Sequence, residues 1–197
     1  AVAAALLPVL AVGATSSTAA RQDSAPAAPP PPRIAEVRPQ LDALVERLVQ
    51  EGRLGRPDGY VYAVDVGLVL LAAALGGHRA RYEALRARAA GEFVVPRPPG
   101  LKAPVVIWRR PRGRLAPPDA SGTTEALQLA YALLAGAEAF DRPEDAALAG
   151  RLLDGYLEHA AELNGVWLVR NYYNLQTRNF ATNSFLIDYA PDLFDRT

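Results

Sequence analysis

The sequence predicts an all-α fold built from helical hairpins, on the basis of three observations. Over much of residues 34–160, apolar residues recur at intervals of three and four, the period of an amphipathic helix. A segment that is apolar on every side is followed by one with a single apolar face. Polar residues stand before the apolar segments at similar intervals. Stacked helical hairpins have these properties, because each hairpin buries its apolar faces only against its neighbours.

The first three predicted helices come before a proline-rich segment. An amphipathic helix runs from Ile34 to Gln50 and ends at the glycines that follow. The segment Tyr62–Leu75 has Asp65 as its one polar residue and is predicted to be a helix buried on every side. The Arg-rich segment His78–Ala90 has an apolar face and is expected to cover that helix from outside.

A long ordered loop with a possible short strand is predicted between the two hairpins. Seven prolines between Phe93 and Pro118 forbid a continuous helix there. The run Val105–Trp108 inside it has the composition of a short strand. Loops of more than about 12–15 residues in compact domains are usually functional or disordered, and a Trp among arginines argues against disorder.

The second hairpin follows this loop. Ser121 or Gly122 can cap a helix whose third position is near Glu125, an imperfect capping box. Pro143 fits the first turn of the next helix, which is expected to continue to a turn at Asn164–Gly165. A last short helix is predicted from Thr182 to Asp188.

The starts of the buried helices carry polar residues at regular spacing. Asp65, Asp119 and Asn171 stand at or just before such starts and are separated by 54 and 52 residues. Repeated hairpins form curved arrays, in which equivalent loops lie along one rim. These polar residues are therefore expected on one rim of the fold.

The first 33 residues are expected to lie outside the folded domain, as a signal peptide that is removed and a linker that follows it. Residues 1–20 hold a 14-residue apolar run and then small residues that suit signal peptidase, which predicts a truncated signal peptide and an exported, periplasmic or extracellular protein. A membrane anchor is the alternative, but a span needs about 20 apolar residues. Stable membrane insertion is thus not expected once the signal is removed. Residues 21–33 are a Pro/Ala-rich linker, and the hairpin domain covers residues 34–197.

Composition disfavours several function classes. The 21 basic residues balance the 21 acidic ones, so a nucleic-acid partner is not expected. There is no Cys, and His78 and His159 lack helical metal spacing, so no metal site and no cofactor is predicted. His159 is expected to face solvent. The sequence leaves the oligomeric state open.

The segment Trp167–Tyr189 alternates aromatic residues with amides, hydroxyls and arginines. Burying an unpaired amide costs roughly 1–3 kcal/mol, so amides gather where hydrogen bonds are needed. Flat rings beside neutral donors and acceptors suit a sugar. The predicted partner is therefore a polysaccharide or oligosaccharide.

Residues 118–134 give this interpretation a family. They read Pro-Asp-Ala-Ser-Gly-Thr-Thr-Glu-Ala-Leu-Gln-Leu-Ala-Tyr-Ala-Leu-Leu, which resembles the Asp-containing loop and inner helix of the six-hairpin glycosidases, the (α/α)6 toroids, and most of all family 8 endoglucanases. Tyr62–Asp65 and Asn171–Asn174 look like equivalent rim segments. The resemblance implies part of a toroid and glycoside hydrolysis. Two features depart from it: the chain has fewer helices than six hairpins need, and the family's catalytic glutamate motif has no recognisable counterpart.

Glycosidic cleavage needs one protonated carboxyl and one carboxylate. The carboxyls near polar rim segments are Asp119, Glu125 and Asp188, and each has a structural alternative: a turn residue, a helix cap and a helix end, respectively. Asp65 is either a rim carboxyl that binds substrate or a buried acid paired with an arginine.

The predicted substrate-binding residues are aromatic, cationic or amide side chains near helix ends. Of two adjacent tyrosines on an extended segment, only one can enter the core. Besides Asp65, the set comprises Trp108, Arg109, Trp167, Arg170, Asn171, Tyr172, Tyr173 and Asn183.

The sequence thus predicts an exported carbohydrate-active protein, with glycoside hydrolysis as the leading reaction. The alternative is a non-catalytic helical scaffold or binding module of the cell envelope, in polysaccharide export or protein–protein interaction. An enzyme should bring two carboxyls together in an aromatic-lined groove, whereas a scaffold should leave its acidic residues dispersed.

Overall fold

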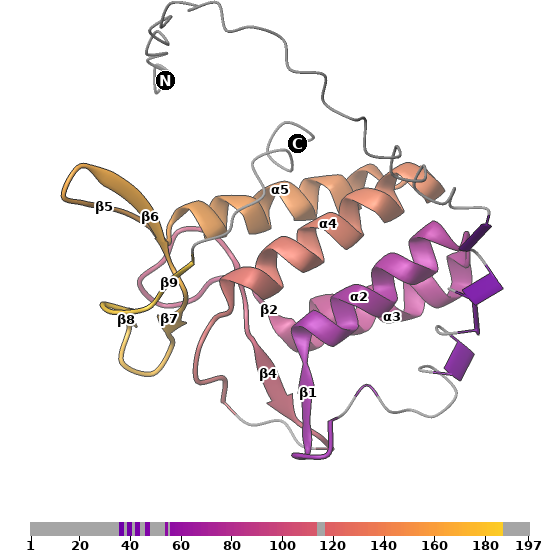
Figure 1. The fold of residues 1–197 in the computed structure, drawn as a ribbon, viewed down its shortest axis with the longest axis horizontal. Coiled ribbons are helices and arrows are strands. Elements are labelled where there is room, and N and C mark those ends of the chain that lie inside the picture. The colour runs from indigo at the N-terminus through magenta and orange to yellow at the C-terminus, as the bar shows by residue number, and fades with distance from the viewer. Residues whose placement is uncertain are drawn as a thin grey trace, which may run out of the picture. The chain divides into compact units, whose positions relative to one another are not determined.

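Two helical hairpins form the larger part of the fold (Figure 1). The computed structural model describes residues 36–37, 39–40, 42–43, 46–47, 54, 56–113 and 117–186. The predicted signal peptide, the linker and Asp188 lie outside these residues. Within the first predicted helix, the residues described between positions 36 and 47 are helical.

Each hairpin pairs a more buried helix with an amphipathic one. The first consists of α2 (Ala63–Leu75) and α3 (Arg79–Phe93), and the second of α4 (Thr123–Phe140) and α5 (Pro143–Leu157). Helices α2 and α4 lie side by side and start at the same end of the fold, while α3 and α5 run back in the opposite direction (Figure 1). The two parallel helices begin at positions 63 and 123, sixty residues apart. The helical-hairpin prediction is confirmed for this part of the chain.

The core lies where α2 meets α4. Leu70 and Ala73 on α2, and Ala130 and Leu133 on α4, are completely or almost completely buried. Burying one Leu or Val side chain contributes about 1.5–3 kcal/mol, and the same core continues through Phe93 of α3 and Leu152 of α5. Helix α2 is apolar at nearly every position, but the prediction that it is buried on every side is only partly correct, because Leu68 is 51% exposed and Leu75 36%. No helix in the described part of the chain combines the length and apolar character that a membrane crossing requires.

Short strands accompany the helices, so the all-α expectation is only partly correct. The predicted strand within the proline-rich loop exists but is shorter, and it pairs antiparallel with the end of the first hairpin: Val94 faces Val106 and Val95 faces Val105. The β-branched residues can pair here because the surrounding prolines prevent a helix. The strands are β1 (Tyr60–Tyr62), β2 (Val94–Val95), β3 (Val105–Val106), β4 (Arg109–Pro111), β5 (Ala160–Leu163), β6 (Val166–Arg170), β7 (Tyr173–Asn174), β8 (Asn179–Phe180) and β9 (Phe185–Leu186).

Helix α5 ends earlier than predicted, at Leu157, and Asn164–Gly165 turns a β-hairpin instead. Both turn residues have positive φ angles, 54° and 79°. A two-residue turn of type I′ requires this conformation, and Asn-Gly is its preferred sequence. The hairpin of β5 and β6 projects from the helical body (Figure 1).

The predicted last helix, Thr182–Asp188, is wrong for the residues that are described. Phe185 and Leu186 form β9, which pairs antiparallel with Arg170 and Val169 of β6. The free edge of β6 supplies backbone partners that a short isolated helix would lack. The third predicted rim segment therefore belongs to a region of short strands.

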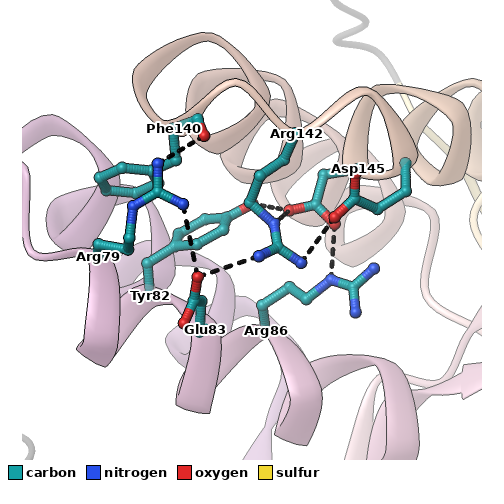
Figure 2. A network of polar contacts seen from close by, with 8 residues as sticks. Arg79, Tyr82, Glu83, Arg86, Phe140, Arg142 and Asp145 are labelled. Carbon is teal, nitrogen blue, oxygen red and sulfur yellow. Dashed lines mark hydrogen bonds and ion pairs between the residues drawn. The ribbon is translucent and has the colours of Figure 1, made fainter.

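A buried polar network joins the two hairpins on the side of α3 and α5 (Figure 2). Asp145 has no exposed surface and accepts hydrogen bonds from Tyr82 (2.8 Å), Arg86 (2.6 Å) and Arg142 (3.0 Å). Burial and the hydrogen bond to Asp145 raise the pKa of Tyr82. Gly136 allows the Tyr82 ring to pack against α4, because a Cβ atom there would lie 2.0 Å from the ring. The network fixes how α3 meets α5.

Candidate functional site

A pocket of about 360 Å³ opens at the start of α4. Three segments that are distant in the sequence contribute to it: the chain between β3 and β4, the residues that lead into α4, and the turn between β6 and β7. Its lining residues are Trp108, Asp119, Ala120, Ser121, Gly122, Glu125, Asn171, Tyr172 and Asn174. Five of the predicted site residues are among them: Trp108, Asp119, Glu125, Asn171 and Tyr172.

Backbone hydrogen bonds hold these segments together. The amide of Gly122 donates to the Val106 carbonyl (2.7 Å), which ties the start of α4 to β3. On the other side, the amide of Ser121 donates to the Tyr173 carbonyl (2.9 Å). The segment that carries Asp119 thus lies between the other two walls like the middle strand of a small sheet.

Asp119 is a partly exposed carboxylate with fixed hydrogen-bond donors. Its Oδ1 accepts hydrogen bonds from Nε1 of Trp108 and from the backbone amide of Ala120, both at 2.8 Å. A guanidinium nitrogen of Arg109 lies 4.0 Å from its Oδ2. An indole N–H and an amide N–H can only donate, so together they fix the orientation of the Asp119 carboxyl and occupy its Oδ1.

Glu125 lies in the first turn of α4, and its side chain is partly buried. Burial raises its pKa, although its own backbone hydrogen bond and the charge of Arg56 act in the other direction. The positive end of α4 would also favour the ionised form. Desolvation outweighs these contributions, so Glu125 retains its proton at a higher pH than an exposed glutamate.

The capping alternative for Glu125 is not what the structure shows. In a capping box its side chain would accept the amide proton of the N-cap residue, which is Gly122 here. That amide is already used by Val106. The Glu125 carboxyl instead packs against Gly122, where an added Cβ atom would lie 2.1 Å from Oε2.

The opposite wall is formed by Asn171, Tyr172 and Asn174. The Asn171 carbonyl accepts a hydrogen bond from Oγ1 of Thr123 at 2.8 Å, which ties this wall to the first turn of α4. As the alternation of an extended segment predicts, Tyr172 is 36% exposed and Tyr173 only 2%. Tyr173 is therefore a core residue whose hydroxyl donates to the Pro99 carbonyl (2.7 Å).

Arg109 stands beside the pocket but does not line it. Its guanidinium lies over the Trp108 ring at 4.0 Å and over the Tyr60 ring at 4.1 Å. Such cation–π contacts contribute about 0.5–2 kcal/mol each, and here they hold the cation close to Asp119. The sequence predicted that Arg109 binds substrate, whereas the structure places it behind Trp108.

Other predicted site residues do not line the pocket. Asp65 forms a two-pronged ion pair with Arg56 (2.8 and 2.9 Å), so the predicted arginine partner is present, but the carboxyl is partly exposed and not buried. Trp167 lies on the projecting β5–β6 hairpin and is 71% exposed. Arg170 packs over Phe180, and Asn183 faces solvent. The rim predicted from equal spacing is thus only partly assembled.

The structure adds two residues that the sequence did not indicate as functional. Ser121 lines the pocket, and His159 lies behind it with 2% of its surface exposed. The prediction that His159 faces solvent is wrong, because α5 ends at Leu157 and the imidazole then packs against Phe180 and Ser121. Only the position of Ser121 before a helix start was a signal, and it indicated a cap. Among the described residues, no group of three or more acidic or histidine side chains could hold a metal ion.

No known family and no curated protein sequence matches the chain. Solved structures do. The endo-β-1,4-glucanase CMCax from Acetobacter xylinum is 18% identical with a TM-score of 0.58, over 71% of this chain and 44% of that one. Endoglucanase Cel10 from Klebsiella pneumoniae, a family 8 glycosyl hydrolase, is 15% identical with a TM-score of 0.55, over 66% and 44%. An endoglucanase from Komagataeibacter sucrofermentans is 17% identical with a TM-score of 0.52, over 58% and 35%.

These comparisons establish a distant relationship in fold. The chain spans less than half the length of each of these three proteins. It therefore has part of the (α/α)6 glycosidase fold, and the resemblance seen in residues 118–134 is confirmed at this level.

Proposed function

We propose that the pocket at the start of α4 binds a polysaccharide and hydrolyses a glycosidic bond in it. One observation carries the proposal: two carboxyls in unlike environments line the same aromatic and amide-rich pocket. Glu125 is shifted towards its protonated form by burial, while Asp119 is surrounded by hydrogen-bond donors. Glycoside hydrolysis requires such a pair, because an acid and a carboxylate must be present at one pH.

The environments assign a role to each carboxyl. Glu125 donates its proton to the glycosidic oxygen, and the bond from that oxygen to the anomeric carbon breaks. Asp119 acts as the second carboxylate. It stabilises the positive charge that develops on the sugar and assists the addition of water to the anomeric carbon. Trp108 and Ala120 hold Asp119 by its Oδ1, which leaves Oδ2 for substrate or water.

The walls supply the contacts that a sugar needs. Tyr172 and Trp108 offer apolar ring surface for the C–H faces of a pyranose. Asn171 and Asn174 bring amide groups to the same space, and amides can pair with hydroxyls without adding charge. The pocket thus combines apolar ring surface with hydrogen-bonding groups, as a sugar requires.

A β-1,4-linked glucan is the first substrate to test, because the structures with a similar fold include a protein named as an endo-β-1,4-glucanase. The composition of residues 1–20 supports a site of action outside the cytoplasm. Both points are part of the proposal.

The test measures the release of reducing ends from a panel of neutral and uronic polysaccharides that includes a soluble β-1,4-glucan. Asp119→Asn and Glu125→Gln are compared with wild type. The matched controls are Asp154→Asn and Glu162→Gln, because both side chains are exposed and neither lines the pocket. We expect turnover by wild type and both controls, and a loss of at least about a hundredfold in both pocket variants, as is typical when an acid–base group is removed.

Turnover that survives in Asp119→Asn and Glu125→Gln would refute the assigned roles. No turnover by wild type on any polysaccharide, together with sugar binding that Tyr172→Ala abolishes, would instead support the non-catalytic binding module. The missing counterpart of the family 8 glutamate motif is the observation that favours this second candidate.

A further inference from the structure

Behind the pocket, His159 and Ser121 form a buried hydrogen-bonded pair. Each has only 2% of its surface exposed. Nε2 of His159 lies 3.0 Å from Oγ of Ser121, and Nδ1 lies 2.8 Å from the Gly155 carbonyl oxygen. The backbone amide of Tyr173 donates to the same Ser121 oxygen at 2.8 Å. The pair therefore connects the end of α5 to two walls of the pocket.

The hydrogen-bond partners assign the direction of each bond. A carbonyl only accepts, so Nδ1 of His159 carries the proton that points to Gly155. In the neutral imidazole Nε2 is then an acceptor, and the Ser121 hydroxyl donates to it. The oxygen of Ser121 consequently turns its lone pairs towards the Tyr173 amide.

The surroundings of His159 keep it neutral. Burial lowers its pKa, while the Gly155 carbonyl and the charge of Glu158 raise it and the charge of Arg170 lowers it further. Desolvation is the largest of these contributions. The Phe180 ring, whose centroid lies 5.3 Å from that of the imidazole, packs edge-on against it.

The same geometry argues against a nucleophilic serine. A serine hydrolase needs free N–H groups beside the nucleophile to stabilise the oxyanion. The amides of Gly122 and Thr123, which follow Ser121, donate instead to the carbonyls of Val106 and Asn171. The pair is thus suited to holding the backbone in place.

We propose that His159 is a positioning residue of the pocket. Its neutral imidazole fixes the Ser121 hydroxyl as the acceptor for the Tyr173 amide, and so docks the wall of Tyr172 and Asn171 on the wall of Asp119. The proposal rests on the function assigned above in that this pocket is where the sugar binds. Loss of the pair should loosen Tyr172 relative to Asp119 and weaken substrate binding more than the chemical step.

The test compares His159→Leu, His159→Gln and Ser121→Ala with wild type. Glutamine can present an amide oxygen where Nε2 stands and should rescue the pair, whereas leucine cannot. The matched control is His78→Leu, which changes the other histidine. His78 lies between α2 and α3, at the end of the hairpin far from the pocket, and its partner is Asp42. Ser121→Ala keeps the test possible if His159→Leu does not fold.

Two quantities are measured. The first is the hydrogen-exchange rate of the Tyr173 amide, which needs no ligand. The second is the pair of constants KM and kcat on the soluble β-1,4-glucan. For His159→Leu and Ser121→Ala we expect exchange about tenfold faster and KM about tenfold higher, the effect of roughly one hydrogen bond, with kcat changed less. His159→Gln and His78→Leu should stay within about twofold of wild type on the same hydrogen-bond scale.

The outcomes separate this proposal from the proposed function. Unchanged Tyr173 exchange in both His159→Leu and Ser121→Ala overturns the positioning role, even if the wild type hydrolyses glucan. Equal effects of glutamine and leucine at position 159 also overturn it, because they would show a packing role alone. If wild type lacks turnover but the exchange pattern follows the expectation, the proposed function fails and the positioning role stands.

Discussion

The indole nitrogen of Trp108 lies 2.8 Å from Oδ1 of Asp119, and this hydrogen bond joins two of the three segments that form the pocket. Indole Nε1 can only donate, so the bond fixes which oxygen of the carboxylate is occupied. The other oxygen faces the cation of Arg109 at 4.0 Å. Trp108 therefore has two roles, as an apolar wall and as the group that orients the carboxylate.

Replacing Trp108 by Phe should test the orienting role. The ring surface is largely kept, but Asp119 loses a donor that is worth about 1.5–3 kcal/mol to a charged group. We expect kcat/KM on glucan to fall about ten- to a hundredfold, which is that free energy expressed as a rate ratio. Steady-state kinetics would measure it. Trp167→Phe on the projecting hairpin is the matched control and should leave kcat/KM unchanged.

The raised pKa of Glu125 predicts a pH dependence of stability. The folded state binds the Glu125 proton more tightly than the unfolded state, so its contribution to stability is complete below the ordinary value of 4.5 and is lost as the pH rises through the folded-state pKa. Glu125→Gln is always neutral and avoids this loss. Its Tm should exceed that of wild type at neutral pH, and the difference should vanish below about pH 4, where an exposed glutamate is itself protonated. An equal difference at every pH would contradict the shift.

Gly122→Ala should displace the acid without unfolding the protein. The backbone at Gly122 has a φ angle of −131°, which alanine adopts freely. The new Cβ atom would lie 2.1 Å from Oε2 of Glu125, so this carboxyl must leave its position. We expect turnover to fall at least about tenfold while Tm changes little, since proton transfer by a positioned acid contributes about 10²–10⁴-fold. Gly91→Ala in α3 is the control, because open space surrounds that position and alanine should stabilise the helix by about 0.5–1 kcal/mol.

The network in Figure 2 predicts that substitutions of its members lower the free energy of unfolding by unequal amounts. Tyr82→Phe removes one donor to buried Asp145 and should lower the free energy of unfolding by about 1–2 kcal/mol. Asp145→Ala leaves Arg86 and Arg142 without their shared carboxylate and should cost about 3–5 kcal/mol. Glu83→Gln breaks partly exposed ion pairs with Arg79 and Arg142 and should cost less than about 1 kcal/mol. Urea unfolding of the three variants would measure these values, and similar costs for Glu83→Gln and Asp145→Ala would contradict the network.

The hairpins were predictable from sequence because periodicity reports burial directly. In the second predicted helix, Asp65 is the one polar residue in an apolar run, which predicted a buried helix; most of α2 is buried, although Leu68 is exposed. The pocket was predictable in part from position in the sequence. Asp119 precedes α4 by a few residues and Glu125 lies in its first turn, so both are found at the start of this helix.

The remaining elements were not predicted, because they depend on pairing between residues that are far apart in the sequence. The strand at Phe185 depends on the free edge of β6 around Arg170, which no local pattern reveals. Asn164–Gly165 did carry a hairpin signal, but apolar residues at helical spacing before it favoured a longer helix. His159 looked exposed because the end of α5 was placed too late.

The most direct test of the central claim is a crystal structure of Glu125→Gln with a β-1,4-gluco-oligosaccharide. The substitution removes the acid and leaves the shape of the pocket, so the substrate should remain intact. We expect a sugar ring between Trp108 and Tyr172, with a glycosidic oxygen within about 3 Å of the side-chain amide introduced in α4, the hydrogen-bond reach of an acid catalyst. An empty pocket at saturating oligosaccharide, or sugar bound only at Trp167 on the projecting hairpin, would contradict the account.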